Sequence, residues 1–419
     1  MANRYATKTG NWSDVTVWDG GTDLPTTGDT VRPNTYTVTI DQDITVTLLT
    51  NNASAPASAG GSFALNNNVT VNANITAYAV NCVTLSGTNN ATINGTLTGG
   101  SSGSSDQCAI RKTSTGTLTI TGNVLGGTGG SGYNCGLWVS ATGTINITGD
   151  VRGGTAGSYP FGIRSTTAAA TLNITGNVEG GTGGSYPRGL MLESGGTVTI
   201  NGSVTGKYNS AILIQTTAVT LTINGNVNGG TTSNIGAIYF SGNLASTVTI
   251  TGNVTAGSTG HGIYVAGGGF TMTINGNVLG STTGDFGYGI YIYGYNQTFT
   301  LNIYGNVSGG SRSSEYAAIF FENGGVGTIN VYGNVIGGSS ATKPSPAIDS
   351  WSKSPVITVS GGIVYGSNGC TPITTAFYFI KGSITGTLYN GASRKLNTKA
   401  LANATHGNKS FGRRYFVGS

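Results

Sequence analysis

One short pattern recurs along almost the whole chain, about every 26 residues. It consists of an aliphatic anchor, a Thr, Asn or Tyr, a glycine, a small polar residue and a second aliphatic residue. Its clearest copies read TLTITGNV (117–124), TLNITGNV (171–178) and TLTINGNV (220–227). The anchors are Ile40, Val71, Ile93, Ile120, Ile147, Ile174, Ile200, Ile223, Ile250, Ile274, Ile303, Val331, Val359 and Ile384. A period of this length predicts stacked copies of one structural unit rather than several independent domains.

Each repeat divides into three short strands. The first alternates apolar and Thr residues, as in Leu118, Thr119 and Ile120, and the glycine after the anchor allows a tight corner. A second strand starts at the next aliphatic residue, and a third follows a Gly/Ser/Thr-rich loop. The sequence therefore predicts an all-β parallel β-helix, or β-solenoid, of about 13 to 14 coils with about 26 residues and three short strands per coil. Its handedness stays open.

The composition agrees with such a fold. Charged residues make up 8% of the chain, where an ordinary soluble domain has roughly 25%, and there are 72 glycines. No stretch of about 18 apolar residues occurs, and the first residues contain no secretory apolar segment. We expect a protein made in the cytoplasm without a signal peptide, with no membrane partner.

The two ends depart from the repeat. Residues 1–35 are predicted to be an N-terminal cap, because an open coil would expose a sheet edge, and residues 36–390 to be the solenoid. The segment GNWSDVTVWDGGTDLPTTGDTV (10–31) carries Trp12, Trp18, Leu24 and Val31 among turn residues. With its Trp, paired Gly, Pro and Gly-Asp in that order, it resembles the G8-like opening module found ahead of β-solenoids in extracellular and phage proteins. The rest of the chain resembles phage tailspike and fibre solenoids in architecture alone.

An outward stripe follows the third strand. Because strand side chains alternate, the residue after each third-strand aliphatic points outward, and most of these residues are apolar or aromatic. They are Trp138, Arg164, Met191, Leu213, Tyr239, Tyr264, Tyr291 and Phe320. Three explanations stay open: loops bearing Tyr133, Tyr159, Tyr186 and Tyr208 cover the stripe, identical chains pack along it as a homo-oligomer with a trimer favoured, or sugars stack on its rings.

A second ladder lies on the first strand. Threonine pairs such as Thr117/Thr119 and Thr220/Thr222 repeat there, with Asn in some copies such as Thr144/Asn146. The ladder resembles the T-x-T arrays of β-helical ice-binding proteins in spacing. Thr is also simply a good outward strand residue, and the Asn interruptions favour that second explanation.

Catalytic chemistry finds weak support in the sequence. Cleavage of a glycoside needs two carboxyls roughly 5 to 9 Å apart, and the nearest candidates are Asp150 and Glu179. Arg152 is placed to form a ladder salt bridge with Glu179 instead. Further single acids and the two histidines are Asp285, Glu315, Glu322, His261 and His406. The two histidines have no partner at metal-ligand spacing, and the three acids, on neighbouring coils, are expected to be solvated charges. We therefore expect no catalytic residue, no metal and no cofactor, although a site shared between subunits stays open.

The C-terminal segment 391–419 lacks the solenoid pattern and is basic. Residues 350–419 contain eight basic and no acidic side chains. The candidate docking residues are Arg394, Lys395, Lys399, Lys409, Phe411, Arg413, Arg414, Tyr415 and Phe416. Arg and aromatic anchors suit docking on an acidic protein surface, whereas clustered basic charge alone would also suit nucleic acid. Protein docking is favoured because no nucleic-acid-binding fold is present.

Four cysteines are present: Cys82, Cys108, Cys135 and Cys370. The first three are spaced by one repeat, so they are expected in neighbouring coils. Three thiols in a row cannot all pair, and buried reduced thiols are therefore expected.

These features lead to an expected function. The chain is predicted to be a non-enzymatic bacteriophage virion protein, such as a fibre, spike or capsid decoration, on the virion surface, with other virion proteins bound through its tail. The alternatives are a tailspike-like polysaccharide depolymerase, a glycan-binding adhesin that contacts a host surface glycan, and, more distantly, an ice-binding protein.

Overall fold

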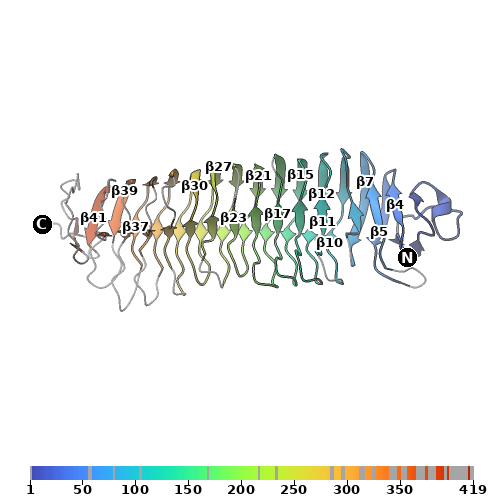
Figure 1. Ribbon diagram of the computed structural model, residues 1–419, viewed down its shortest axis with the longest axis horizontal. Helices are drawn as coiled ribbons and strands as arrows, with labels where there is room; N and C mark the ends of the chain where they lie inside the picture. The colour runs from blue at the N-terminus through green and yellow to red at the C-terminus, as the bar shows by residue number, and fades with distance from the viewer. Residues whose placement is uncertain are drawn as a thin grey trace. The chain divides into compact units, whose positions relative to one another are not determined.

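The protein is an all-β solenoid. A computed structural model describes residues 2–54, 59–78, 81–102, 106–167, 169–215, 218–231, 235–283, 287–293, 298–310, 317–322, 326–338, 347–350, 356–364, 373–375, 384–390, 394–395 and 414–415. Parallel strands stack as about 11 turns of about 27 residues each, which confirms the predicted fold class (Figure 1). Within the described residues the single helix is a 3-10 turn, η1 (Val15–Val17). None of these residues belongs to a helix with the length and apolarity to cross a membrane.

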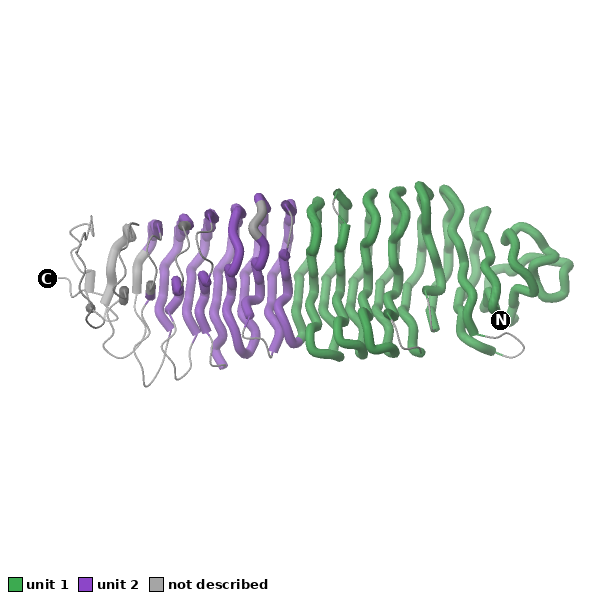
Figure 2. The backbone as a smooth tube through the Cα atoms, viewed as in Figure 1, with its two compact units in different colours: residues 1–207 green, residues 208–419 purple. Residues whose placement is uncertain are grey.

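The chain divides into two compact units, residues 1–207 and 208–419 (Figure 2). In the first unit, the first-strand series is β1 (Asn3–Tyr5), β3 (Thr30–Arg32), β5 (Ile44–Thr50), β7 (Val69–Thr76), β9 (Ala91–Asn94), β12 (Leu118–Thr121), β15 (Gly143–Thr148), β18 (Ala170–Thr175) and β21 (Gly196–Asn201). The second-strand series is β10 (Leu97–Thr98), β13 (Val124–Leu125), β16 (Val151–Arg152), β19 (Val178–Glu179) and β22 (Val204–Thr205). The third-strand face comprises β2 (Gly10–Asn11), β4 (Thr37–Ile40), β6 (Ser62–Leu65), β8 (Val83–Thr84), β11 (Ile110–Lys112), β14 (Leu137–Val139), β17 (Ile163–Ser165) and β20 (Leu190–Leu192).

The second unit repeats the same three series. Its first strands are β24 (Val219–Ile223), β27 (Asn243–Ile250), β30 (Gly268–Ile274), β33 (Thr298–Ile303), β36 (Val326–Val331), β39 (Val356–Val364) and β41 (Ile384–Asn390). Its second strands are β25 (Val227–Asn228), β28 (Val254–Thr255), β31 (Val278–Leu279), β34 (Val307–Ser308) and β37 (Val335–Ile336). Its third strands are β23 (Ile212–Ile214), β26 (Ile238–Phe240), β29 (Ile263–Val265), β32 (Ile290–Ile292), β35 (Ile319–Phe321), β38 (Ile348–Ser350) and β40 (Ile373–Thr375).

The core consists of the aliphatic residues that the repeat places on the inner side of each strand. In β12, Leu118 and Ile120 are fully buried, whereas Thr119 between them faces outward. Equivalent anchors lie directly above one another, since Ile120 pairs in register with Ile147 and Ile147 with Ile174. Each apolar side chain therefore packs on its copy one coil away, and the parallel ladder satisfies the backbone polar groups.

The structure corrects two anchors near the ends. Ile40 lies in β4, which pairs with β6 on the third-strand face, and the residue that pairs with Val71 is Ile44, 27 residues before it. Ile384 pairs with Ile357 rather than with Val359, again at a separation of 27. The regular coils are about 11, fewer than the predicted 13 to 14, and at the N-terminal end the repeat pattern also matches a strand of the third-strand face. Short aliphatic–polar alternation looks the same on every face of a solenoid, so pairing alone identifies the face.

A glycine forms the corner two residues after twelve of the fourteen anchors. Gly122, Gly149 and Gly176 have φ of +146 to +147°, and a Cβ atom at Gly149 would lie 2.3 Å from the carbonyl oxygen of Gly122. The corner thus requires glycine both for its backbone conformation and for the close approach of the neighbouring coil.

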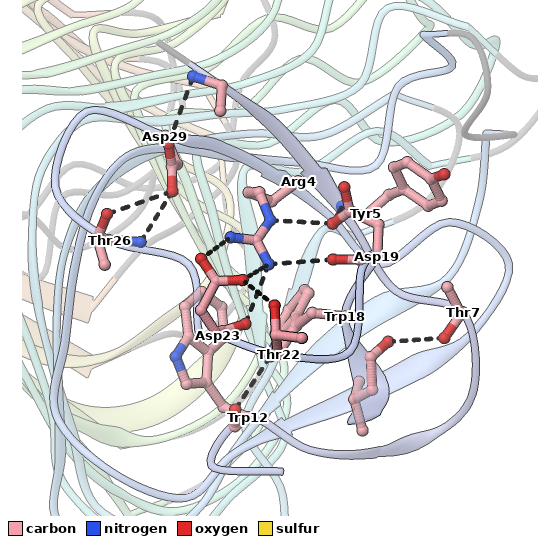
Figure 3. Close-up of polar contacts among 12 residues, drawn as sticks. Arg4, Tyr5, Thr7, Trp12, Trp18, Asp19, Thr22, Asp23, Thr26 and Asp29 are labelled. Atoms are coloured by element: carbon pink, nitrogen blue, oxygen red, sulfur yellow. Dashed lines mark hydrogen bonds and ion pairs between the residues drawn. The ribbon is translucent and has the colours of Figure 1, made fainter. Parts of the chain in front are cut away.

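Two tryptophans fill the N-terminal end of the first unit. Trp12 and Trp18 are buried, their ring centroids lie 4.7 Å apart, and the Trp18 indole N–H donates to the Trp12 carbonyl at 3.0 Å. Nearby, the Arg4 guanidinium forms ion pairs with Asp19 at 3.0 Å and with Asp23 at 3.1 Å (Figure 3). Because β1 pairs with β3 and β3 with β5, this segment continues the stack at the coil end while the indoles cover its apolar interior.

At the other end of the second unit the pairing changes direction. Strand β42 (Arg394–Lys395) runs antiparallel to β41, and β43 (Arg414–Tyr415) runs antiparallel to β40. Antiparallel pairing ends the parallel stack at those strands.

The cysteines agree with the predicted chemistry where the structure describes them. Cys82, Cys108 and Cys135 are free and buried. Burial raises the pKa of the Cys82 thiol, and burial together with the neighbouring Cys108 raises that of Cys135. The Cys82 and Cys135 thiols are therefore protonated and weakly nucleophilic at neutral pH. Cys370 lies outside the described residues.

Candidate functional site

The predicted outward stripe forms continuous ladders of side chains in each unit. In the first unit Trp138 pairs in register with Arg164, and Arg164 with Met191. In the second unit the ladder runs from Leu213 through Tyr239, Tyr264 and Tyr291 to Phe320. Met191, Leu213 and Phe320 are 8%, 3% and 4% exposed, and the other ladder residues are half-buried. At these three positions the stripe is therefore covered within the single chain.

Arg164 is the centre of the first-unit ladder. Its guanidinium lies 3.9 Å from the ring centroid of Tyr133 and 4.6 Å from that of Trp138. The same group contacts both carboxylate oxygens of Glu193, the shortest distance being 2.9 Å. Tyr133 comes from a loop, so a loop residue does fold over the stripe here, and the charge of Arg164 is balanced within the chain.

A second aromatic row runs along the loops of the first unit. Tyr133 stacks on Tyr159 with centroids 4.9 Å apart, and Tyr159 stacks on Tyr186 at 5.4 Å. These are three of the four loop tyrosines noted in the sequence. Arg188 lies 5.9 Å from the ring of Tyr186, at the end of the row.

The rings of the second-unit ladder are nearly parallel. Tyr239 and Tyr264 have centroids 4.9 Å apart at 7°, Tyr264 and Tyr291 lie 5.0 Å apart at 7°, and Tyr291 and Phe320 lie 5.5 Å apart at 14°. Each interior ring therefore has its two faces against neighbouring rings and presents an edge outward. A sugar stacks on the electron-rich face of an aromatic ring, so the interior of this ladder is a poor platform for sugars.

A histidine is buried beside this ladder. His261 is 1% exposed, and its ring centroid lies 4.6 Å from that of Tyr291 and 5.3 Å from that of Tyr288. Burial lowers the pKa of His261 to about 3, so the imidazole is neutral at physiological pH. Burial in the same surroundings, and to a lesser extent the neighbouring Tyr239 phenol, raises the pKa of Tyr264 to about 12.

The candidate carboxylates are engaged in structural contacts. Glu179 lies in register with Arg152 and contacts it at 3.0 Å, and the Lys207 ammonium lies 3.5 Å from the same carboxylate. The predicted ladder salt bridge is therefore confirmed. Asp150 accepts a hydrogen bond from the Asn177 backbone N–H at 2.8 Å, and its own N–H donates to the Asn123 amide at 2.9 Å.

Asp150 thus belongs to a ladder of corner amides. In the second unit, the backbone N–H groups of Asn253, Asn277, Asn306 and Asn334 each donate, at 2.8 to 2.9 Å, to the side-chain oxygen of the corner Asn one coil earlier. The sequence repeat contains this Asn, but only the stacked structure shows that its side chain hydrogen-bonds to the next coil. These side chains fasten consecutive corners together.

The remaining acidic and histidine candidates have different outcomes. Glu322 accepts a hydrogen bond from the Tyr291 hydroxyl. Burial, and secondly this hydrogen bond, raises the pKa of Tyr291. Asp285, Glu315 and His406 lie outside the described residues. Among the residues that the structure describes, no cluster of three His, Cys, Asp or Glu side chains could hold a metal ion.

The outward Thr/Asn ladder is held together by its amides. Asn173 donates to Asn146 at 2.9 Å and Asn330 donates to Asn302 at 2.8 Å. These bonds join the amide positions of the ladder to each other along the stack, which accounts for the Asn interruptions of the Thr pattern.

Two exposed tyrosines were not singled out from the sequence. Tyr304 and Tyr332 are 54% and 47% exposed, and their rings stack with centroids 4.5 Å apart at 6°. They occupy the corner position directly after an anchor, where other coils carry Thr or Asn, as at Thr251 and Asn275. The available signal was this change from a small polar residue to an aromatic one in two successive coils.

Only part of the predicted docking tail is described. Arg394 and Lys395 lie in β42, and Arg414 and Tyr415 in β43. Lys399, Lys409, Phe411, Arg413 and Phe416 lie outside the described residues.

A buried lysine in the first unit was also missed. Lys112 is 0% exposed, and its ammonium donates to the carbonyl oxygen of Thr142 at 2.7 Å and to that of Ser114. It occupies the inward position of β11 that holds Val139 in the next coil. Burial lowers its pKa to about 8.

The lowered pKa predicts a pH effect on stability. Below pH 8 Lys112 is protonated in both the folded and the unfolded state, and the cost of burying the charge is fully present. As pH rises from 8 to about 10.5 the folded state loses its proton first, so the stability of the wild type relative to Lys112→Met rises by about 2–3 kcal/mol. Denaturant unfolding of both proteins at pH 7, 8, 9 and 10 measures this difference. A difference independent of pH contradicts the prediction.

Comparison with known proteins adds no relative. No family model matches the chain, and neither a curated protein nor a solved structure was found to be similar.

Proposed function

We propose that this chain is a non-enzymatic structural protein, a β-solenoid component of a bacteriophage virion surface such as a fibre, spike or capsid decoration. The proposal rests on one observation above all. The best catalytic candidates in the sequence serve as fasteners between coils, because Glu179 is paired with Arg152 and Lys207, and Asp150 bridges the corners of two neighbours. The resemblance of the sequence to phage fibre and tailspike solenoids, in architecture alone, supports the virion role.

The partners follow from the same reasoning. The basic tail 391–419 is proposed to dock on other virion proteins, and side-by-side packing of identical chains as a trimer is proposed for the solenoid. Met191, Leu213 and Phe320 are already buried within the single chain, so they have little area to offer to a partner. Contacts between copies are expected instead from the edges of the half-buried rings, such as Tyr264 and Tyr291.

The virion role is tested on particles. Phage particles from the source culture are purified on a density gradient and probed with an antibody raised against the recombinant protein. We expect the protein to comigrate with the particles and immunogold label to lie on their surface. Recovery of the protein only in the particle-free fractions contradicts the proposal.

The depolymerase alternative is tested separately. We expect no release of oligosaccharides when the protein is incubated with purified host surface polysaccharide. If release does occur, the variants Glu179→Gln and Asp150→Asn show whether these carboxylates catalyse the cleavage of the polysaccharide. Loss of release in either variant, with unchanged β-structure by circular dichroism, would replace the structural function by an enzymatic one.

A further inference from the structure

Tyr304 and Tyr332 form an exposed aromatic platform that no structural role described above uses. They follow the anchors Ile303 and Val331, which pair in register, so the two rings stand one coil apart at the same corner. Each corner is fixed by its backbone, since the Tyr304 N–H donates to the Ile274 carbonyl at 2.9 Å and the Tyr332 N–H to the Ile303 carbonyl at 2.8 Å. The backbone that carries the two rings is therefore held in place before any ligand arrives.

Among the residues that the structure describes, no ring covers the outer face of this platform. In the following coil Val359 pairs with Val331, so the residue that stands over the Tyr332 ring is Ser360. A serine side chain has one heavy atom beyond Cβ and cannot cover a phenol ring, and both Ser360 and Tyr332 are exposed. The interior rings of the other ladders have neighbours on both faces, whereas none of the described residues places a ring above the outer face of Tyr332.

Polar groups border the open face. Asn330 precedes Tyr332 by two residues on the outward side of β36, and Thr358, exposed, pairs with Asn330 in the next coil. A flat apolar face next to an amide and two hydroxyls matches a pyranose ring. The axial C–H groups of such a ring pack on the aromatic face while its hydroxyls hydrogen-bond at the rim.

We propose that the outer face of Tyr332, backed by Tyr304 and bordered by Asn330, Thr358 and Ser360, binds a pyranose unit of a surface polysaccharide. The exposed area favours this ligand over a second protein chain. Two half-exposed tyrosines offer roughly 200 Å², whereas a stable protein interface takes about 800 Å² from each partner. The site does not depend on the virion role, because it requires only the corner geometry.

The repeat itself supplies the variants that test the site. At the same corner, Thr251 and Asn275 make the equivalent backbone bonds, from Thr251 N–H to the Ile223 carbonyl at 3.0 Å and from Asn275 N–H to the Ile250 carbonyl at 2.8 Å. Tyr332→Thr is therefore expected to fold, and it removes the ring face. Tyr332→Phe keeps the face and removes only the hydroxyl. Tyr186→Thr removes a comparably exposed ring, 43% exposed, from the loop row of the first unit.

The experiment measures binding of the full chain to a microarray of bacterial surface polysaccharides. Single sugars bind such a face with dissociation constants of roughly 1 mM, so a polymeric probe that presents many copies is needed. We expect the wild type to bind at least one polysaccharide, Tyr332→Thr to reduce binding at least tenfold, and Tyr332→Phe and Tyr186→Thr to remain within about twofold. Circular dichroism confirms that each variant is folded.

Three results of the binding experiment overturn the site. They are wild-type binding to none of the polysaccharides, binding that Tyr332→Thr leaves unchanged, and an equal loss in Tyr186→Thr. A change of molecular mass in Tyr332→Thr, measured by light scattering, would instead assign the platform to contact between copies and would also overturn the proposal. Particle association of the protein is measured independently, so failure of this site leaves the virion role standing.

Discussion

Replacing Gly149 by alanine is expected to lower the free energy of unfolding by about 3 kcal/mol or more. Alanine at this position has to adopt φ of +146°, which strains its backbone. Its Cβ would also lie 2.3 Å from the Gly122 carbonyl oxygen, a backbone atom that cannot move without shifting the neighbouring coil. Thermal and denaturant unfolding followed by circular dichroism measure the loss.

Gly87→Ala is the matched control. Gly87 has φ of +63°, but nothing lies within 4 Å of the position that an added Cβ would take, so only the backbone strain of about 1 kcal/mol is expected. Equal losses in the two variants would mean that the close approach of the coils contributes nothing. An unchanged Gly149→Ala protein would contradict the corner geometry itself.

Acid is expected to destabilise the second unit through His261. The folded pKa of about 3 lies below the ordinary value of 6.5, so between these two values the unfolded state binds a proton that the folded state excludes. The loss of stability caused by His261 is therefore absent above pH 6.5 and grows as pH falls, reaching about 3 kcal/mol of unfolding free energy at pH 4. Protonation would place a charge among the rings of Tyr264, Tyr288 and Tyr291.

His261→Gln isolates this effect, because it keeps a polar side chain of similar size that does not titrate. Denaturant unfolding of both proteins at pH 7, 6, 5 and 4 is expected to show a steeper fall for the wild type, while carboxylate titration affects both equally. Parallel curves for the two proteins would show that His261 takes up its proton without cost.

The sequence was sufficient for the fold class. The inward residues Leu118 and Ile120 and the corner glycines repeat with the period of one coil, and period-2 alternation with a fixed glycine is a property of the chain itself. It also predicted the pair of Arg152 and Glu179, since both occupy the same repeat position in consecutive coils.

In the end coils the sequence pattern does not identify the face to which a strand belongs. Ile40 and Ile44 are both aliphatic residues in alternating segments, and only the pairing with Leu65 and Val71 assigns them to different faces. Alternation specifies which side of a strand is buried, but it does not specify which strand lies beneath.

The candidate surfaces were decided by the tertiary structure. The repeat positions of Trp138, Leu213, Tyr264 and Phe320 lie in register ladders. The sequence left open whether the Tyr133 loop covers one ladder, and it gave no sign that Tyr288 packs on Phe320 in the other. Those loops vary in length, so the repeat does not determine which side chains their residues contact. Likewise the open face of Tyr332 depends on the register that puts Ser360 above it.

The sequence by itself determined the coil, its buried side and its corners, because these follow from local alternation and from the conformations that glycine alone adopts readily. Only the tertiary structure decided which outward rings are stacked, which are covered and which present a face to solvent. Those properties depend on side chains about 27 residues or more apart in the sequence, brought together by the winding of the backbone.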